Sequence, residues 1–335
     1  MASVADSLDG LIHGLNKAEL HLHLEGSVEP ETVIELDPSL KVEEVRARYH
    51  HTDFAGFIQG YIWINRKLQR PEHYGLITRR LLERLALQNV TWAEINLSAG
   101  VILWKEQNFS AIFDAVAEAA EAQSAVEVRW IFDAVRQFGA ADAQRVAELA
   151  AERTDRGVVG FGIGGDEAAG PCGWFRDVFA FAKQNGLALL PHAGETAGAE
   201  SVAAALDCGA DRIGHGIRSI DDPGVMRELR DRNIPLEVCM TSNVCTGSVA
   251  SLEDHPVRRL FDAGVPITLN TDDPALFRTT LEREYRVASD VFGFSERELR
   301  SVAQNAWRYR CSGANEPAAS VQAPGDQPEQ RHVSE

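Results

Sequence analysis

Residues 158–194 contain the pattern that decides the fold: VVGFGIGG at 158–165, CGWFRDVFAFAKQNG at 172–186 and LALLPHAG at 187–194. The two outer runs are short and apolar on both faces, which is typical of buried strands, and the middle run has a helical pattern. A strand, a helix and a second strand in this order predict a parallel sheet covered by helices. The same alternation continues in both directions, with the other strand-like runs at 18–24, 90–98, 126–134, 211–216, 235–243 and 265–273.

Eight such units in about 250 residues predict an α/β protein with a closed (β/α)8 barrel, the TIM barrel. An open, doubly wound sheet is the alternative architecture. No G-x-G-x-x-G follows the first strand-like run, which disfavours a dinucleotide-binding version of that sheet.

Two segments extend the minimal barrel. Residues 37–89 follow the first strand and contain extra helical runs, including DFAGFIQGYIWINRKL at 53–68. An insertion after a barrel strand lies at the mouth where barrel chemistry takes place, so we expect a substrate lid here. Residues 279–310 predict two more helices. We therefore expect one domain over 1–310 and a disordered tail over 311–335, which lacks apolar periodicity.

Composition excludes several classes of partner. The 335-residue chain is 44% hydrophobic and has a formal charge of −17. Such an acidic protein is a poor match for nucleic acids or for anionic membrane surfaces. We find neither a signal peptide nor an apolar run of about 18 residues, so we expect no membrane segment. The five cysteines form no C-x-x-C pair, which favours a cytoplasmic protein without disulfides.

Polar side chains gather at the predicted carboxyl ends of four strands, which is where barrel enzymes carry their chemistry. Each of these residues has an ordinary alternative interpretation as a turn, a helix cap or an exposed side chain. Their conjunction at one predicted rim favours a functional site. The residues are His21, His23, His192, Glu195, His215, Asp272 and Asp273.

Imidazole and carboxylate side chains are suitable zinc ligands. His21 and His23 are two residues apart on a strand, so both rings face the same way. A two-metal hydrolase site is the alternative, and such barrels often bridge their metals with a modified lysine from strand 4. VVGFGIGG contains no lysine, so we expect one zinc ion per chain, held by the set His21, His23, His192 and Asp272. Glu195 and His215 then remain for proton transfer.

Six motifs together resemble the adenosine deaminase family. ELHLHLEGSVEPET, GIGGDE, PHAGE, RIGHG, SNVCTG and LNTDDP occur in the family's order across roughly residues 17–290. Each motif is weak alone, but the ordered set is specific. The resemblance implies a (β/α)8 barrel of the amidohydrolase superfamily, and this agrees with the strand count.

The resemblance also implies roles for individual residues. Zinc would bind His21, His23, His192 and Asp272. Glu195 would protonate N1 of a purine, and His215 would orient and deprotonate the water that attacks C6, so that ammonia leaves and a 6-oxopurine forms. The Gly165 backbone would bind N3, and Asp273 would bind N7. The expected small-molecule substrate is adenosine by default.

The substrate branch stays open because several positions depart from the nucleoside pattern. Glu25 stands where many family members have an aspartate that contacts the sugar 5′ hydroxyl. HLEG is found in the branch that acts on adenine, but SNVCTG lacks that branch's PLSN-type pattern. A third branch acts on aminodeoxyfutalosine, an adenosine with a bulky 5′ extension, and Glu25 together with a short lid is compatible with an altered 5′ pocket.

Two other kinds of protein remain as alternatives: another mononuclear metal-dependent hydrolase, and a non-catalytic metal-binding protein. The sequence leaves the oligomeric state open. The remaining histidines are expected to have no function, with His50, His51, His73 and His255 at the surface and His13 and His332 near the termini.

Overall fold

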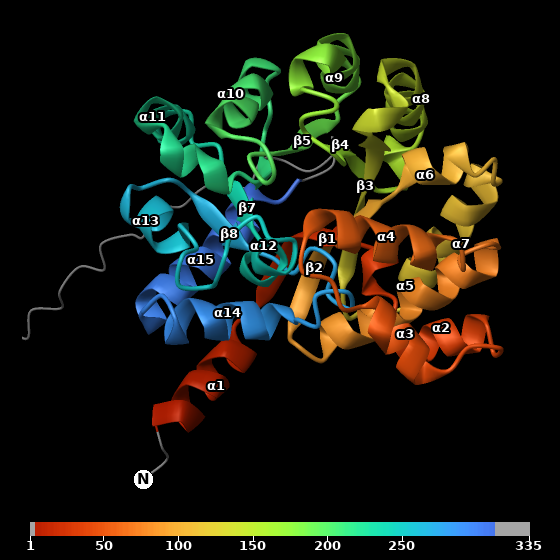
Figure 1. Ribbon diagram of the computed structural model, residues 1–335, viewed down its shortest axis with the longest axis horizontal. Helices are drawn as coiled ribbons and strands as arrows, with labels where there is room; N and C mark the ends of the chain where they lie inside the picture. The colour runs from red at the N-terminus through yellow and green to blue at the C-terminus, as the bar shows by residue number, and fades with distance from the viewer. Residues whose placement is uncertain (1–3, 312–335) are drawn as a thin grey trace, which may run out of the picture.

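The computed structural model describes residues 4–311. Its sheet contains eight strands that follow one another in chain order, and every neighbouring pair is parallel. This is the predicted (β/α)8 barrel (Figure 1). The strands are β1 Lys17–His23, β2 Val90–Leu97, β3 Glu127–Val135, β4 Val158–Gly164, β5 Ala188–Ala193, β6 Ile213–His215, β7 Leu236–Val238 and β8 Ile267–Leu269.

The seam between β8 and β1 is closed by the segment that follows β8. The amide of His23 donates to the carbonyl of Asp272 at 2.8 Å, and the amide of Asp272 donates to the carbonyl of His21 at 3.1 Å. Lower in the seam, the side chain of Asn270 accepts a hydrogen bond from the amide of Leu20 at 2.9 Å. A residue expected in the functional site therefore also joins the two ends of the sheet.

Helices surround the strands (Figure 1). Local signals mark several of their first residues: Asp53 caps α4 through the amide of Gly56, Pro71 begins α5, and Ser295 forms a capping box with Glu298 in α15. The helices are α1 Val4–Gly14, α2 Pro30–Leu36, α3 Val42–Arg48, α4 Phe54–Asn65, α5 Pro71–Ala86, α6 Ala99–Trp104, α7 Phe109–Glu121, α8 Ala140–Ala151, α9 Arg176–Gln184, α10 Ala199–Asp207, α11 Pro223–Asp231, α12 Met240–Cys245, α13 Val257–Asp262, α14 Leu281–Asp290 and α15 Glu296–Tyr309.

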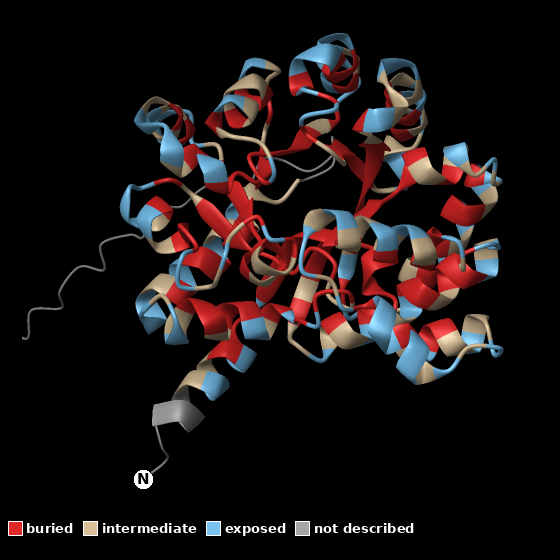
Figure 2. Ribbon diagram, viewed as in Figure 1, coloured by how far each residue is buried: buried red, intermediate tan, exposed pale blue. Residues whose placement is uncertain are grey.

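The two predicted extensions are present. Helices α2 to α5 lie between β1 and β2, and α14 and α15 follow β8. On the helices, buried residues face the strands and exposed residues face outward (Figure 2). Helix α15 contacts β1 and β8, and its Ala306 packs against a small cluster of Ala18, Leu20 and Trp92.

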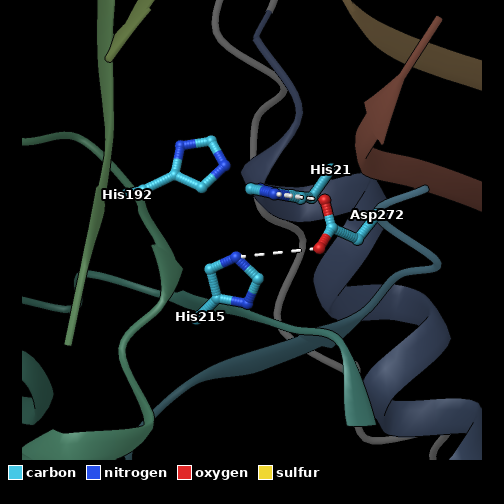
Figure 3. Close-up of side chains that lie close together, drawn as sticks. All are labelled: His21, His192, His215 and Asp272. Carbon is cyan, nitrogen blue, oxygen red and sulfur yellow. Dashed lines mark ion pairs between the residues drawn. The ribbon is translucent and has the colours of Figure 1, made fainter. Parts of the chain in front are cut away.

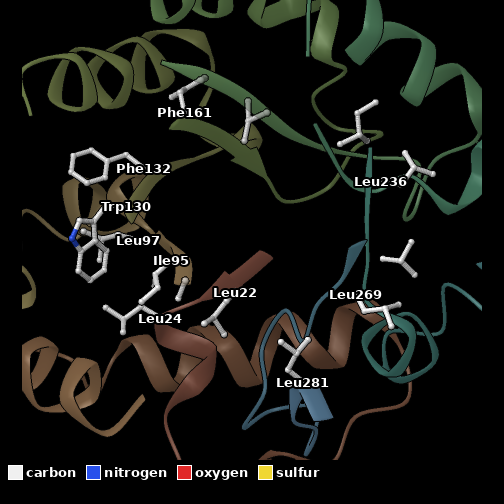
Figure 4. Close-up of a cluster of buried hydrophobic side chains, with 14 of the residues drawn as sticks. Leu22, Leu24, Ile95, Leu97, Trp130, Phe132, Phe161, Leu236, Leu269 and Leu281 are labelled. Atoms are coloured by element: carbon white, nitrogen blue, oxygen red, sulfur yellow. The ribbon is translucent and has the colours of Figure 1, made fainter. Parts of the chain in front are cut away.

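Most of the core lies between the strands and the helices. Successive strands contribute large apolar side chains to one continuous cluster, which includes Leu22, Ile95 and Phe132 (Figure 4). Leu22 lies between His21 and His23 in β1 and is fully buried in this outer layer. Side chains alternate across a strand, so the two flanking histidines face the interior of the barrel.

Strands β7 and β8 are shorter than the sequence indicates. The run 235–243 ends as a strand at Val238, and α12 begins at Met240; the run 265–273 is a strand only over Ile267–Leu269. For β8 the reason is geometric. Asp272 and Asp273 both line the same cavity, and consecutive residues of a regular strand point to opposite faces.

Residue 311 was expected to begin the tail, but Cys311 is described, and its amide donates to Glu94 at 2.6 Å. The rest of the predicted tail, 312–335, lies outside the described residues. Within 4–311, no helix combines the length and apolar character needed to cross a membrane.

Candidate active site

Side chains from β1, β5 and β6 and from the segment after β8 meet at one mouth of the barrel. Nitrogen and oxygen atoms of His21, His192, His215 and Asp272 all lie within 4.8 Å of one another, and Figure 3 shows the three rings facing a common space beside the carboxylate. His23 borders the same space, because its Nε2 lies 3.2 Å from Nε2 of His192 and 3.4 Å from Oδ1 of Asp272. The structure thus brings all four expected metal ligands together.

A shift in strand register helps to place His21. Between Glu19 and Leu22, β1 advances three residues while β2 advances only two, from Ala93 to Ile95. Such a bulge inserts one extra residue and turns the following side chains. As a result Leu20 joins the cluster at the bottom of the barrel, while the next residue, His21, joins the mouth.

The donor set fits a bound cation. The four groups are buried, and Nε2 of His21 makes no hydrogen bond although it lies 3.5 Å from Asp272 Oδ1. The other nitrogen of His21, Nδ1, is 2.7 Å from the Glu237 carboxylate, which fixes the ring with Nε2 directed at the cluster. Carboxylate–histidine pairs of this kind orient metal ligands.

Glu237 was missed by the sequence interpretation. Burial alone would raise its pKa, but the charge of Arg212 and the hydrogen bond with His21 hold the pKa at about 2. Glu237 is therefore ionised at neutral pH. Its signal is weak, since a glutamate inside the apolar run PLEV has no special spacing.

Two residues of the site have backbone conformations that are uncommon outside glycine. His215 has φ of 60° and Asp272 has φ of 66°. Such conformations are held by surrounding structure and are often found at functional sites. Asp272 is held by the β8–β1 seam and by the Ser242 hydroxyl, which donates to Oδ2 at 2.6 Å.

Glu195 lies beside the cluster, with Oε2 at 3.7 Å from Nε2 of His215. Burial first, and then the charges of Asp272 and Glu167, raise the pKa of Glu195 to about 8. The carboxyl group is therefore mostly protonated at neutral pH, as a general acid requires.

Glu167 shapes the loop that contains Glu195. Its carboxylate accepts hydrogen bonds from the amides of Gly194, Glu195 and Thr196 at 2.7–2.8 Å, and it also accepts from the Ser201 hydroxyl. This residue was also missed, although it lies in the GIGGDE motif.

A cavity of about 270 Å³ opens over these groups. The predicted residues Gly165 and Asp273 both line it. Gly165 has φ of +95°, and a Cβ there would lie 2.3 Å from the Gln137 side chain, so only glycine fits. Asp273 is buried against Gly26, and its Oδ1 has no hydrogen-bond partner among the described residues.

Glu25 does not line this cavity. It is fully buried behind the wall, where it accepts hydrogen bonds from the Ser98 amide at 3.1 Å and from the Tyr61 hydroxyl at 3.3 Å. Ser98 and Tyr61 do line the cavity. Glu25 therefore contacts two residues that line the cavity, Ser98 through its backbone amide and Tyr61 through its hydroxyl group.

Asp133, at the end of β3, is a further carboxylate in the cavity that was not predicted. Its Oδ1 is buried without a hydrogen-bond partner in the described part of the chain. A Cβ on Gly162 would lie 2.7 Å from Oδ1, and one on Gly164 would lie 3.1 Å from Oδ2. The glycines of β4 thus make room for this side chain, and the combination of G-x-G with an aspartate at the preceding strand end was the available signal.

His73 and His255 were expected at the surface, and that expectation is wrong for both. The ring of His73 hydrogen-bonds to the Lys67 carbonyl, and the ring of His255 packs against Phe292. His255 also bonds to Asn243, which in turn bonds to His215. Helical periodicity alone did not reveal these partners.

Comparison with known proteins gives the same assignment as the motifs. The profile of the adenosine deaminase family matches residues 16–319. The chain belongs to the adenosine deaminase family. As a member, it is a hydrolase that acts on a C–N bond of an aminopurine.

Individual relatives of this deaminase differ in substrate. An aminodeoxyfutalosine deaminase from Streptomyces coelicolor is 39% identical over 319 residues, which cover 90% of this chain and 81% of the relative. The crystal structure of an adenine deaminase from Arthrobacter aurescens is 29% identical with a TM-score of 0.85, covering 90% and 95% of the two chains. The structure of an N6-methyl-AMP deaminase from Arabidopsis thaliana is 27% identical with a TM-score of 0.81, covering 91% and 94%.

Proposed function

We propose that this protein is a zinc-dependent deaminase of a 6-aminopurine nucleoside that carries a bulky 5′ extension, of the kind represented by aminodeoxyfutalosine. The observation that carries the proposal is the composition of the cavity wall. Adenosine, the default expectation from the sequence, lacks the 5′ extension, and we expect it to be a poorer substrate.

The cavity has two chemically different parts. The floor is polar and contains the histidine and carboxylate groups described above. The outer wall is apolar and comes largely from α4. The wall residues are Phe54, Phe57, Ile58, Tyr61, Ile62, Val101, Val135 and Phe138.

Neither a nucleotide nor a free base accounts for this wall. A 5′ phosphate is normally held by arginine, lysine or clusters of amide groups, and the described lining includes no lysine or arginine. A free purine would occupy the polar floor and leave the aromatic wall without a partner. The apolar atoms of a 5′ extension on the sugar would bury that wall, at roughly 25 cal/mol per Å² of apolar surface removed from water.

The floor is suited to zinc for the reasons of donor type, burial and orientation given above. His21, His23, His192 and Asp272 are the proposed ligands. When bound, zinc lowers the pKa of a coordinated water and so supplies a nucleophile near neutral pH.

The remaining floor residues bind the purine and move protons. Glu195, protonated at neutral pH, donates to N1 and makes C6 more electrophilic. Water adds at C6, the amino group leaves as ammonia, and a 6-oxopurine remains. In this proposal the Gly165 amide donates to N3, and Asp273, whose pKa burial and the neighbouring Asp272 raise, donates to N7.

The test is ammonia release by the zinc-loaded protein with four substrates: adenine, adenosine, AMP and aminodeoxyfutalosine. We expect the highest kcat/KM for aminodeoxyfutalosine. A kcat/KM that is highest for adenine or for AMP would contradict the proposed substrate class, and silence on all four would contradict the deamination of these purines.

The wall is tested by Phe54→Ala. Loss of one large apolar contact costs about 1.5–3 kcal/mol, so kcat/KM for the extended substrate should fall by roughly 10- to 100-fold. Adenosine turnover should change little, because adenosine does not reach the outer wall. Val291→Ala, an exposed apolar site on another face, is the matched control. Equal losses on both substrates would show that Phe54 does not contact the extension.

A further inference from the structure

We infer that Asn243 and His255 are positioning residues, which hold the His215 ring so that its Nδ1 accepts a hydrogen bond and its Nε2–H faces the active site. The chemical use of that Nε2–H rests on the proposed function. The direction of the hydrogen bonds is independent of it and is tested separately.

The direction of these hydrogen bonds is set at His255, the residue of the three that lies farthest from the cavity. The backbone amide of Val257 lies 3.1 Å from Nδ1 of His255. A backbone amide only donates, so Nδ1 of His255 accepts and carries no proton. The ring must then carry its proton on Nε2. Burial lowers the pKa of His255 to about 3, which keeps the ring neutral.

Asn243 joins the two histidines and fixes which atom donates in each hydrogen bond. Nε2 of His255 lies 3.1 Å from Oδ1 of Asn243, and the Asn243 amide nitrogen lies 3.1 Å from Nδ1 of His215. Because His255 donates at Nε2, the asparagine must present its oxygen to it. The NH₂ group then donates to His215. All three side chains are buried, so bulk water does not substitute for a lost partner.

His215 therefore carries no proton on Nδ1, and its proton lies on Nε2. This nitrogen faces the reacting space, at 3.7 Å from Glu195 Oε2 and 3.9 Å from Asp272 Oδ2. A protonated nitrogen has no lone pair for a cation. Of the five side chains around the metal position, His215 is thus the one that does not ligate, and His23 completes the set.

The hydrogen bonds from His255 through Asn243 to His215, which we call the relay, also change the expected role of His215. The family resemblance implies that His215 takes a proton from the attacking water. With Nε2 already protonated, the ring instead donates a hydrogen bond to the oxygen that attacks C6. The two protons of the water then go elsewhere: one goes to the amino group that leaves as ammonia, and one restores the Glu195 carboxyl group that has protonated N1.

The direct test is NMR of the zinc-loaded protein with ¹⁵N-labelled histidine. Long-range ¹H–¹⁵N correlation spectra distinguish a ring protonated at Nε2 from one protonated at Nδ1. We expect the Nε2–H pattern for both His215 and His255. An Nδ1–H pattern at either ring would overturn the inference, whatever substrate the enzyme uses.

Variants test the relay itself. Asn243→Asp replaces the donor with a second acceptor, so the proton of His215 should move to Nδ1. His255→Leu removes the donor that orients Asn243, and we expect kcat to fall by on the order of 10- to 100-fold, with zinc content unchanged. His255→Gln, whose amide still donates to Asn243, should recover a large part of the loss.

His73→Leu is the matched control, because it also removes a buried histidine but lies outside the relay. We expect His73→Leu to leave the His215 pattern and kcat unaltered. A purely structural role for His255 predicts equal kcat for His255→Leu and His255→Gln and an unchanged His215 pattern in Asn243→Asp; either result would contradict the relay.

Discussion

Glu195 combines a buried carboxyl group with a neighbouring negative charge, and both keep its proton in place up to a pKa of about 8. As a general acid it works only in the protonated form. We therefore expect kcat/KM to fall as the pH rises through about 8. Glu195→Gln should reduce kcat by roughly 10²- to 10⁴-fold and remove this pH limb, with zinc content retained.

Stability provides a second measurement on the same variant. The folded pKa of Glu195 lies above its unfolded value, so the folded state binds more protons between about pH 4.5 and 8, and ionising Glu195 costs stability as the pH rises. Glu195→Gln should therefore unfold at the same or a higher temperature than wild type at pH 8.

The control for both measurements is Glu200→Gln, on the exposed surface of the next helix. Near-normal turnover by Glu195→Gln would exclude the acid role.

Asp133 offers a buried carboxylate oxygen that no described residue satisfies. A hydroxyl or amino group of bound substrate is the natural partner. Burial raises the pKa of Asp133 to about 7, so the carboxyl group is ionised only in part at neutral pH, and Asp133→Ala should raise KM about tenfold, at roughly 1–1.5 kcal/mol for the lost hydrogen bond. Steady-state kinetics with a parallel zinc assay measure this, with exposed Asp155→Ala as the control. An unchanged KM would exclude contact with substrate.

Individual site residues could be predicted from the sequence where they lie at the carboxyl ends of strands. His21, His23, His192 and Asp272 were predictable because alternation and parallel topology place them at one rim. Asn243 and His255 were not, because their roles depend on pairwise contacts between separate elements. Asp133 required knowledge that β3 and β4 are adjacent at that level.

Among the elements, the loop between β5 and α10 depends on a single side chain. Glu167 accepts four backbone hydrogen bonds there, and a glutamine would present NH₂ donors to some of the same amides. We expect Glu167→Gln to lower the free energy of unfolding by about 1–3 kcal/mol. It should also lower kcat, because Glu195 shifts. Chemical denaturation and ammonia release measure the two effects, and a stable variant with normal kcat would show that the loop does not need this contact.

The order and number of the elements were predictable because each strand-like run is short, apolar and followed by a helical pattern. The lengths of β7 and β8 were not predictable. After β7 the apolar residues Cys239 and Met240 continue past the end of the strand. After β8 the turn at Asp272 depends on hydrogen bonds to β1 rather than on local propensity.

For the whole molecule, the size of the apolar core determines how metal removal acts. The core extends around the barrel without using the metal position, so chelation should abolish turnover while the helical circular dichroism signal remains. Re-added zinc should restore activity. The apoprotein should melt at a lower temperature, because a ligand bound only by the folded state stabilises it by RT ln(1 + [L]/Kd). Loss of helicity on chelation would instead indicate a structural metal.

Asp272 belongs at once to the seam of the barrel and to the metal position. Its amide and carbonyl join the two ends of the sheet, while its carboxylate faces the ligand cluster. We therefore expect opening of the seam and release of a bound cation to be coupled. Amide hydrogen exchange at His23 and Asp272 should slow when the centre is filled, and by more than exchange at strand pairs remote from it. The deuterium exchange rate of these two amides would therefore report whether a cation is bound at the cluster, and this measurement needs no substrate.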